Sequence, residues 1–94
     1  MDELHYQIVT GPGDRIRVYL RGNAANVLVM EDADYVNYRQ GRAYNYYGGY
    51  YTKSPVIIKP RVYGPLNVVI NLGGFAGTVN AVVQIIHQRR RRLR

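Results

Sequence analysis

Five tyrosines and three basic residues are concentrated in one short stretch of this chain. The tyrosines fall within eight residues around Gly48-Gly49: Tyr44, Tyr46, Tyr47, Tyr50 and Tyr51. The cations that flank them are Arg39, Arg42 and Lys53. Tyrosine rings with cations nearby can hold a base, a nucleotide, a sugar or a protein surface. Packing between strands would explain the same rings, and alternation along a strand would send Tyr44 and Tyr46 to one face and Tyr47 to the other.

Residue types that perform catalysis are sparse. The chain has no cysteine, and its two histidines, His5 and His87, lie near opposite ends. The one serine, Ser54, precedes a proline and lacks the glycines of a nucleophile motif. These residues do not suggest a hydrolytic triad, and we predict that the protein is not an enzyme.

Two further motifs have structural explanations. Glu31, Asp32 and Asp34 could offer oxygen ligands to a hard cation, but the capping of a helix accounts for Asp32 and Asp34 without an ion. The sequence G-G-F-A-G at 73–77 follows a strand, as a dinucleotide-binding loop would, but an alternating β pattern comes next instead of a helix. We therefore predict no metal site and no cofactor.

The net charge of +7 is concentrated at the end of the sequence. Five of these charges come from the arginines of the tail: Arg89, Arg90, Arg91, Arg92 and Arg94. The rest of the chain carries only +2 and is nearly balanced. A like-charge block of this kind is typically disordered and can contact nucleic acid or an anionic membrane surface, although a merely solvated tail explains it equally simply.

Alternation of apolar and polar residues, punctuated by glycine and proline, predicts strands along almost the whole chain. We expect them at residues 4–10, 15–21, 27–30, 43–47, 50–53, 56–58, 66–72 and 78–87. The run at 27–30 is apolar throughout and predicts a buried central strand. The fold class that follows is all-β, a compact β-sandwich or small barrel of six to eight short, mostly antiparallel strands.

One short helix is expected at residues 32–40. Asp32 would cap its N-terminus, and Gly41 would end it in a left-handed conformation. Tyr35 and Tyr38 are three residues apart and would share a face of this helix. We divide the chain into a single domain, residues 1–87, and a basic tail, residues 88–94, that we expect to be disordered.

Length and composition narrow the class of protein further. The 94 residues suffice for one modest core, and without cysteine no disulfide framework can form. The acidic N-terminal sequence does not resemble a secretory signal, and no stretch is long and apolar enough for a membrane span. We expect a soluble, cytoplasmic protein.

The last expected strand is more apolar than a half-solvated strand should be, because Val82 and Ile86 face away from Val79 and Ala81. Either the short helix covers this second face or a second copy of the protein does. We favour the second copy and expect a homo-oligomer.

The chain also resembles a known family. The residues that carry the resemblance are P-R-V-Y-G-P-L-N-V-V-I-N-L-G-G-F-A-G at 60–77, with G-D-R-I-R-V, A-N-V-L-V-M-E-D, Y-R-Q-G-R-A-Y-N-Y-Y-G-G, K-S-P-V and G-T-V-N-A-V-V elsewhere. They are similar to the small bacterial family catalogued as "domain of unknown function 1883", over residues 14–85. Leu66 stands where the family suggests an aromatic residue, and Asn71 where it suggests aspartate. The resemblance implies a fold and names no activity, although related modules beside TIR domains hint at signalling or defence.

Taken together, the sequence favours a non-enzymatic binding or interaction module. Its expected surface comprises Arg39, Arg42, Tyr44, Tyr46, Tyr47, Tyr50 and Tyr51, and its partner would be a protein or a nucleotide-like or sugar-like ligand. The alternative is a nucleic-acid-binding protein that uses the arginine tail. A third, weaker interpretation is an enzyme with acidic and tyrosine groups in a pocket near 31–42.

Overall fold

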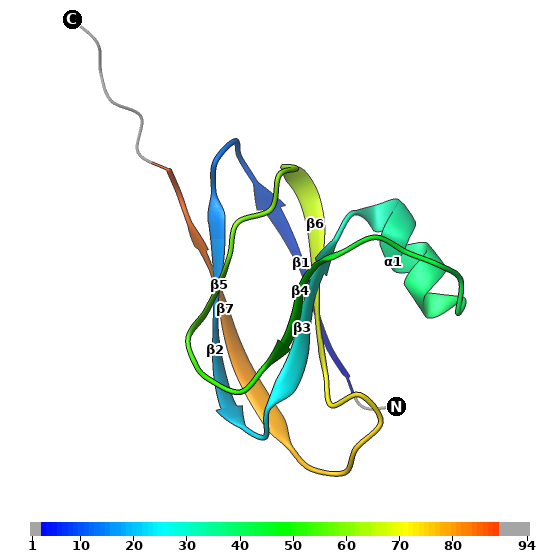
Figure 1. Ribbon diagram of the computed structural model, residues 1–94. Coiled ribbons are helices and arrows are strands. Elements are labelled where there is room, and N and C mark those ends of the chain that lie inside the picture. The colour runs from blue at the N-terminus through cyan, green and yellow to red at the C-terminus, as the bar shows by residue number, and fades with distance from the viewer. Residues whose placement is uncertain (1–2, 89–94) are drawn as a thin grey trace, which may run out of the picture.

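The computed structural model describes residues 3–88 and shows two antiparallel sheets packed face to face (Figure 1). The larger sheet has the order β1-β6-β3-β4, and the smaller sheet has the order β5-β2-β7. The elements are β1 (Glu3–Thr10), β2 (Arg15–Gly22), β3 (Ala25–Met30), α1 (Asp32–Arg39), β4 (Tyr47–Tyr51), β5 (Val56–Ile58), β6 (Gly64–Asn71) and β7 (Val79–Ile86). The predicted all-β sandwich with one short helix is confirmed.

The core lies between the two sheets and is built from alternate residues of each strand. Its buried members are Ile16 and Val18 of β2, Ala25, Val27 and Val29 of β3, Val56 and Ile58 of β5, and Leu66, Val68 and Ile70 of β6. Burying this apolar surface is the main favourable term in folding. Leu66, which stands where an aromatic residue was expected, is fully part of this core.

β3 and β6 are buried on both faces because α1 covers the outer face of the larger sheet (Figure 1). Leu28, Met30 and Val69 point to this outer face and pack against tyrosines from α1 and the segment after it. This second layer explains why the sequence at 27–30 is apolar without alternation, and the predicted central strand is confirmed. Within residues 3–88, no helix is long and apolar enough to cross a membrane.

Asp14 ties the turn between β1 and β2 to the end of β7. Its Oδ2 accepts a hydrogen bond from the backbone N–H of Gly11 at 2.8 Å, and its Oδ1 accepts one from the N–H of Gln88 at 3.0 Å. The Nδ1 atom of His87 lies 3.0 Å from Oδ2. One buried carboxylate thus connects two segments more than seventy residues apart.

We expect the charge of Asp14 to be visible in the pH dependence of stability. The N–H groups of Gly11 and then Gln88 hold its pKa below the ordinary value of 3.8. A carboxyl group with a lowered folded pKa stabilises the protein above its unfolded pKa, and this contribution is lost as pH falls through the folded pKa. The thermal midpoint of the parent should therefore converge on that of Asp14→Asn as pH is lowered below about 4. Glu31→Gln is the charge-matched control. A difference in thermal midpoint between the parent and Asp14→Asn that stayed constant with pH would contradict a role of the Asp14 charge.

The region around Gly48-Gly49 differs from the prediction. We expected two strands, 43–47 and 50–53, separated by the glycines, but one strand, β4, runs through both glycines from Tyr47 to Tyr51. Gly48 pairs with Leu28 at a φ of 116°, and a Cβ there would overlap the carbonyl oxygen of Val27. The glycine permits β4 to approach β3 closely, so here it forms part of a strand instead of breaking one.

The predicted cap of the helix is also wrong. The N-cap residue is Glu31, which makes no side-chain capping bond, and Asp32 is the first helical residue. Asp32 instead accepts a hydrogen bond from Asn67 of β6, and Asp34 accepts one from the backbone N–H of Asn45. The carboxylates therefore bind the sheet and the following loop, contacts that local sequence does not reveal. Gly41, with a φ of 71°, ends the helix as predicted.

The sequence left open whether the helix or a second copy of the protein covers the outer face of β7, and the structure decides about the helix. α1 packs over β6, on the opposite sheet, so it does not cover the outer face of β7. Val82 remains 55% exposed there. The arginines at 89–94, expected to form a disordered tail, lie outside the described residues.

Candidate functional site

A row of polar side chains crosses the outer face of the larger sheet beneath α1. The strand register places Glu3 of β1, Asn71 of β6 and Asn26 of β3 side by side, with Tyr50 of β4 at the end of the row. Outward positions on central strands are normally apolar when a helix covers them. This row is therefore the most unusual chemical feature beneath α1.

Asn71 is the centre of this row. Its Oδ1 accepts hydrogen bonds from Asn26 Nδ2 at 3.0 Å and from the N–H of Gly73 at 2.9 Å, while its Nδ2 donates to the Tyr38 hydroxyl at 3.0 Å. The Tyr38 hydroxyl in turn donates to Glu3 Oε1 at 2.8 Å. Each buried polar atom of the row thus has a partner, and α1 is fixed to the sheet through Tyr38.

Burial, followed by the hydrogen bond to Glu3, raises the pKa of Tyr38 to about 12. The hydroxyl therefore keeps its proton at neutral pH and serves as a donor. A general base needs a pKa near the working pH, so this tyrosine is suited to positioning rather than to proton abstraction.

A second buried amide, Asn67, lies two outward positions from Asn71 on the same face of β6. Its Oδ1 lies 2.8 Å from Nε2 of His5, and its Nδ2 donates to Asp32 at 2.7 Å and, more weakly, to the carbonyl of Met30 at 3.4 Å. Asn67 is only 1% exposed, so these bonds satisfy a group that would otherwise be costly to bury. Asn67 and Asn71 together join α1 to three strands.

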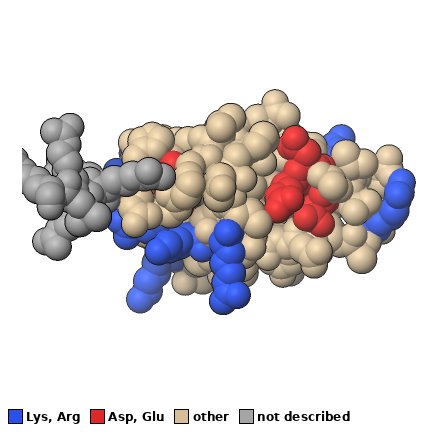
Figure 2. All heavy atoms as spheres, turned by 90° about the horizontal axis from the view of Figure 1, so that it is seen from above, with Lys and Arg blue, Asp and Glu red and all other residues tan. Residues whose placement is uncertain are grey.

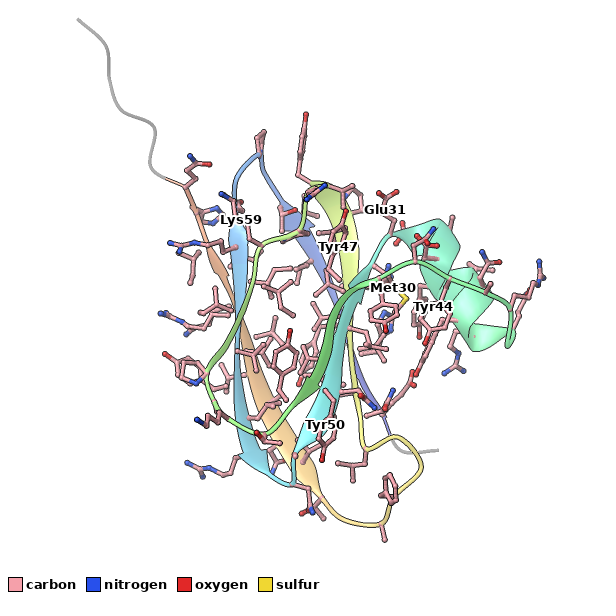
Figure 3. The ribbon with its side chains drawn as sticks, in the orientation of Figure 1. Met30, Glu31, Tyr44, Tyr47, Tyr50 and Lys59 are labelled. Atoms are coloured by element: carbon pink, nitrogen blue, oxygen red, sulfur yellow. The ribbon has the colours of Figure 1, made fainter. Side chains whose placement is uncertain are left out.

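Five aromatic rings form a continuous series above this polar layer. His5 stacks on Tyr35 with centroids 4.1 Å apart, and Tyr35 lies 6.2 Å from Tyr38. Tyr38 meets Tyr44 edge to face at 5.1 Å, and Tyr44 lies 5.6 Å from Tyr46. Figure 3 shows Tyr44 beside α1 and close to Met30. Such pairs hold one another rigidly, so Tyr46 at the end of the series has a supported ring.

The residue types of a hydrolytic triad are kept apart. His87 and Asp14 are in contact at the start of β2, whereas the Oγ of Ser54 accepts a hydrogen bond from the N–H of Leu20 near the other end of that strand. A nucleophile must lie within hydrogen-bond reach of its base, a condition that this arrangement does not meet. Among residues 3–88 there is also no group of three acidic or histidine side chains placed to hold a metal ion.

Comparison with family profiles matches residues 1–89 to the family described as "Domain of unknown function (DUF1883)". The chain belongs to the DUF1883 family. Comparisons with curated proteins and with solved structures found no match. The resemblance seen in the sequence is confirmed, and Asn71, one of its two departures from the expected pattern, proves to be the centre of the polar row.

The seven predicted binding residues of this DUF1883 domain do not form one site. Tyr47 and Tyr51 point inward and pack against the core of the sandwich. Tyr44 packs in the layer under α1, and Arg39 pairs with Glu3 at 3.3 Å. The remaining three are exposed on β4 and the segment leading into it, and we call them the edge surface: Arg42, Tyr46 and Tyr50. Tyr46 is 49% exposed and Tyr50 is 63% exposed.

Sequence reasoning missed the polar layer and the histidine that joins the ring series. It predicted only that Tyr35 and Tyr38 share a face, which the structure confirms. A signal was present in β6, where Asn67 and Asn71 occupy the same face of a strand that is otherwise apolar. Polar residues at two such positions indicate a buried hydrogen-bonded layer, because an unpaired amide there would be costly.

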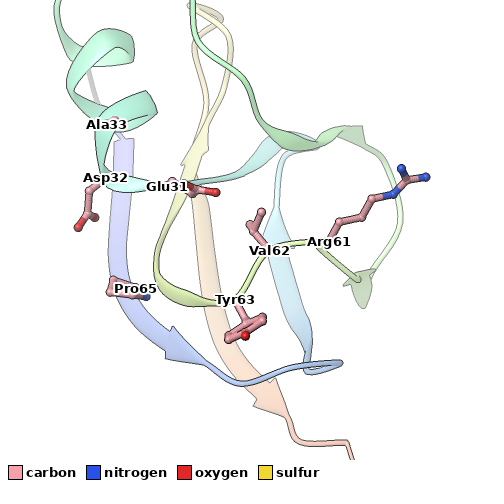
Figure 4. Close-up of a pocket in the computed structure, with 7 residues that line it drawn as sticks. All are labelled: Glu31, Asp32, Ala33, Arg61, Val62, Tyr63 and Pro65. Carbon is pink, nitrogen blue, oxygen red and sulfur yellow. The ribbon is translucent and has the colours of Figure 1, made fainter.

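A separate hollow of about 510 Å³ lies between the start of α1 and the segment before β6 (Figure 4). Glu31, Asp32, Arg61 and Tyr63 contribute polar groups, and Ala33, Val62 and Pro65 complete its lining. Figure 4 shows Arg61 extending away from Glu31. The hollow is therefore lined by carboxylates and by Arg61, whose side chain is directed away from Glu31, and it shares no residue with the edge surface.

Proposed function

We propose that this DUF1883 domain is a non-enzymatic binding module that engages a partner protein through the edge surface. The proposal rests on the position of the Tyr46 ring. This ring packs against Tyr44 and is nevertheless about half exposed to solvent. A rigid exposed tyrosine gives contact area at little entropic cost. Tyr50 and Arg42 add a second ring and a cation, both residue types that are enriched in interfaces.

A partner protein fits this surface better than a small ligand does. Sites for nucleotides or sugars are concave and enclose most of the ligand. The hollows of 510 to 550 Å³ near α1, at Tyr19 and Ser54, and between Glu3 and Asn80 are lined by residues outside the edge surface. A nucleotide-like or sugar-like ligand is therefore the second choice. The resemblance to modules found beside TIR domains directs the search to cytoplasmic proteins of signalling or defence.

Replacing Tyr46, Tyr50 and Arg42 together by alanine should abolish recovery of the partner in a pull-down from the native host. Each lost exposed aromatic anchor is expected to cost about 1 to 2 kcal/mol of binding free energy, because interface energy is concentrated in such residues. The matched control is Tyr63→Ala, since Tyr63 is exposed to the same 63% as Tyr50. Circular dichroism and thermal unfolding should show both variants folded.

Unchanged recovery by the triple variant would refute the edge surface as the site. Equal loss with Tyr63→Ala would show that recovery depends on exposed tyrosines in general. A thermal-shift screen with nucleotides and sugars tests the small-ligand alternative, which would require a shift that the triple variant loses.

We also propose that the domain self-associates through β7. Among the strands of residues 3–88, only β2 pairs with β7, which leaves the other edge of β7 without a strand partner there. Multi-angle light scattering at micromolar concentration should give at least twice the monomer mass of 10.8 kDa. A single species at the monomer mass, unchanged on dilution, would contradict this prediction.

A further inference from the structure

Within residues 3–88, no element covers the outer face of the smaller sheet. One face of β5-β2-β7 closes the core, and α1 packs on the other sheet. Side chains on the uncovered face remain accessible: Tyr19 is 40% exposed, Ile57 is 46% exposed and Val82 is 55% exposed. A sheet face of this kind is available to a partner whose chemistry matches it.

Three arginines and a tyrosine alternate along the central strand of this face. Arg15, Arg17, Tyr19 and Arg21 occupy successive outward positions of β2. The register places Ile86, Gln84, Val82 and Asn80 of β7 opposite them, in that order, with Ile57 of β5 beside Arg17. None of the acidic residues between 3 and 88 occupies an outward position in these three strands. Figure 2 shows several basic side chains projecting from one side and most of the acidic surface gathered elsewhere, with further basic side chains at the opposite end.

Arg17 is held in a defined orientation. Its Nε and one terminal nitrogen donate to Gln84 Oε1 at 3.1 and 2.8 Å, and its guanidinium carbon lies 5.4 Å from the centre of the Tyr19 ring. A guanidinium has five N–H donors, so several remain for an anion. Gln84 and Tyr19 thus fix a cation at the middle of the face before any ligand arrives.

We propose that this face binds single-stranded nucleic acid, with the arginines on phosphates and Tyr19 under a base. Alternating cations and an exposed ring are the two components by which proteins hold single strands without regard to sequence. In a duplex the faces of the bases are stacked, so Tyr19 would have no role. A second copy stacked on this face would place like charges against each other, because three arginines would meet three arginines. The self-association proposed above uses the free edge of β7 and leaves this face open.

More basic residues follow β7 in the sequence. β7 is the neighbour of β2, and its last ladder pair joins Ile86 to Arg15. Five further arginines follow Gln88 in the sequence. The proposed face therefore adjoins the point at which the arginine-rich sequence begins. The proposed nucleic-acid face shares no residue with the edge surface, so a test of one proposal does not decide the other.

Fluorescence anisotropy with a labelled oligothymidine of about 20 nucleotides tests the proposal on the full chain. Substituting Arg15, Arg17 and Arg21 by glutamine should weaken binding at least about tenfold and reduce the slope of log affinity against log salt by about 2, since each phosphate contributes about 0.7. The matched control removes three other arginines, Arg39, Arg42 and Arg61, and should change affinity less than about threefold although its net charge is the same. Thermal unfolding must show both variants folded.

Tyr19→Ala and Tyr19→Phe separate stacking from charge. Alanine should weaken binding at least about fivefold without changing the salt slope, and phenylalanine should retain it, because stacking needs only the ring. A duplex of the same length should bind more weakly and should not respond to Tyr19→Ala.

Several results would overturn the proposal. These are no measurable binding, equal loss in the two triple-arginine variants, or tighter binding to vesicles with anionic headgroups than to the oligonucleotide. A full-length variant with glutamine at all five tail arginines adds a fourth test. If this tail variant lost binding and the Arg15, Arg17 and Arg21 variant kept it, the nucleic-acid site would be the tail and not the sheet face.

Discussion

Replacing Gly48 by alanine is expected to destabilise the domain by at least about 3 kcal/mol. Gly48 has a φ of 116°, which side-chain-bearing residues rarely adopt, and a Cβ there would overlap the carbonyl oxygen of Val27. The overlapping atom belongs to the backbone of the neighbouring strand, so relief requires β4 to separate from β3. Urea unfolding followed by circular dichroism measures the change.

Gly49→Ala provides a control one residue away. A Cβ at Gly49 meets no atom within 4 Å, so the change is expected to alter stability by less than about 1 kcal/mol. Similar effects of the two substitutions would contradict the close approach of β4 to β3. If Gly48→Ala does not accumulate as a folded protein, the folded Gly49→Ala variant still establishes that the position, and not the added methyl group, is responsible.

Asn71→Asp is expected to cost about 1 to 3 kcal/mol at neutral pH. The resemblance to the DUF1883 family suggests aspartate at this position, but here the Tyr38 hydroxyl already donates its hydrogen to Glu3. The Asn71 amide supplies the hydrogen that the Tyr38 oxygen accepts, and a carboxylate cannot do so. The introduced carboxylate and that of Glu3 would compete for one hydroxyl hydrogen and would repel each other.

A second substitution identifies the cause of that loss. Adding Glu3→Gln to Asn71→Asp should recover most of the stability, because one of the two competing charges is removed, whereas Glu3→Gln alone should cost less. The loss should also shrink in acid as the introduced carboxyl group is protonated. An Asn71→Asp variant as stable as the parent would show that the donors Asn26 and Gly73 suffice to hold a carboxylate here.

The strands of the core could be predicted from the sequence because their side chains repeat with the period of the structure. β2 alternates strictly, and its inward residues Ile16 and Val18 are fully buried. The apolar run of β3 correctly indicated a central strand. In both strands the order of apolar and polar residues along a few consecutive positions was enough to predict which side chains are buried.

The candidate site could be predicted only in part, since it depends on residues far apart in the sequence. His5 reaches Asn67 across 62 positions, and Tyr38 reaches Glu3 across 35. The alternation of Tyr44 and Tyr46 with Tyr47 could be predicted, but not which of these rings face the core, because that depends on how β4 pairs with β3. The pairing brings Gly48 close to the carbonyl of Val27, a contact between strands that no local pattern reports.

Neither sheet can be completed until β6 and β7, which lie late in the sequence, have been synthesised. β1 has β6 as its partner in the larger sheet, with Thr10 opposite Gly64, and β2 pairs with β5 and β7. β3 and β4 are the first strands that can pair, at Val29 and Tyr47. Because closing long loops precedes any gain from such contacts, folding is expected to be slow. β1 therefore stays unpaired until β6 has been synthesised, and β2 until β5 has been synthesised. Strands left unpaired in this way are prone to aggregate before the sandwich closes.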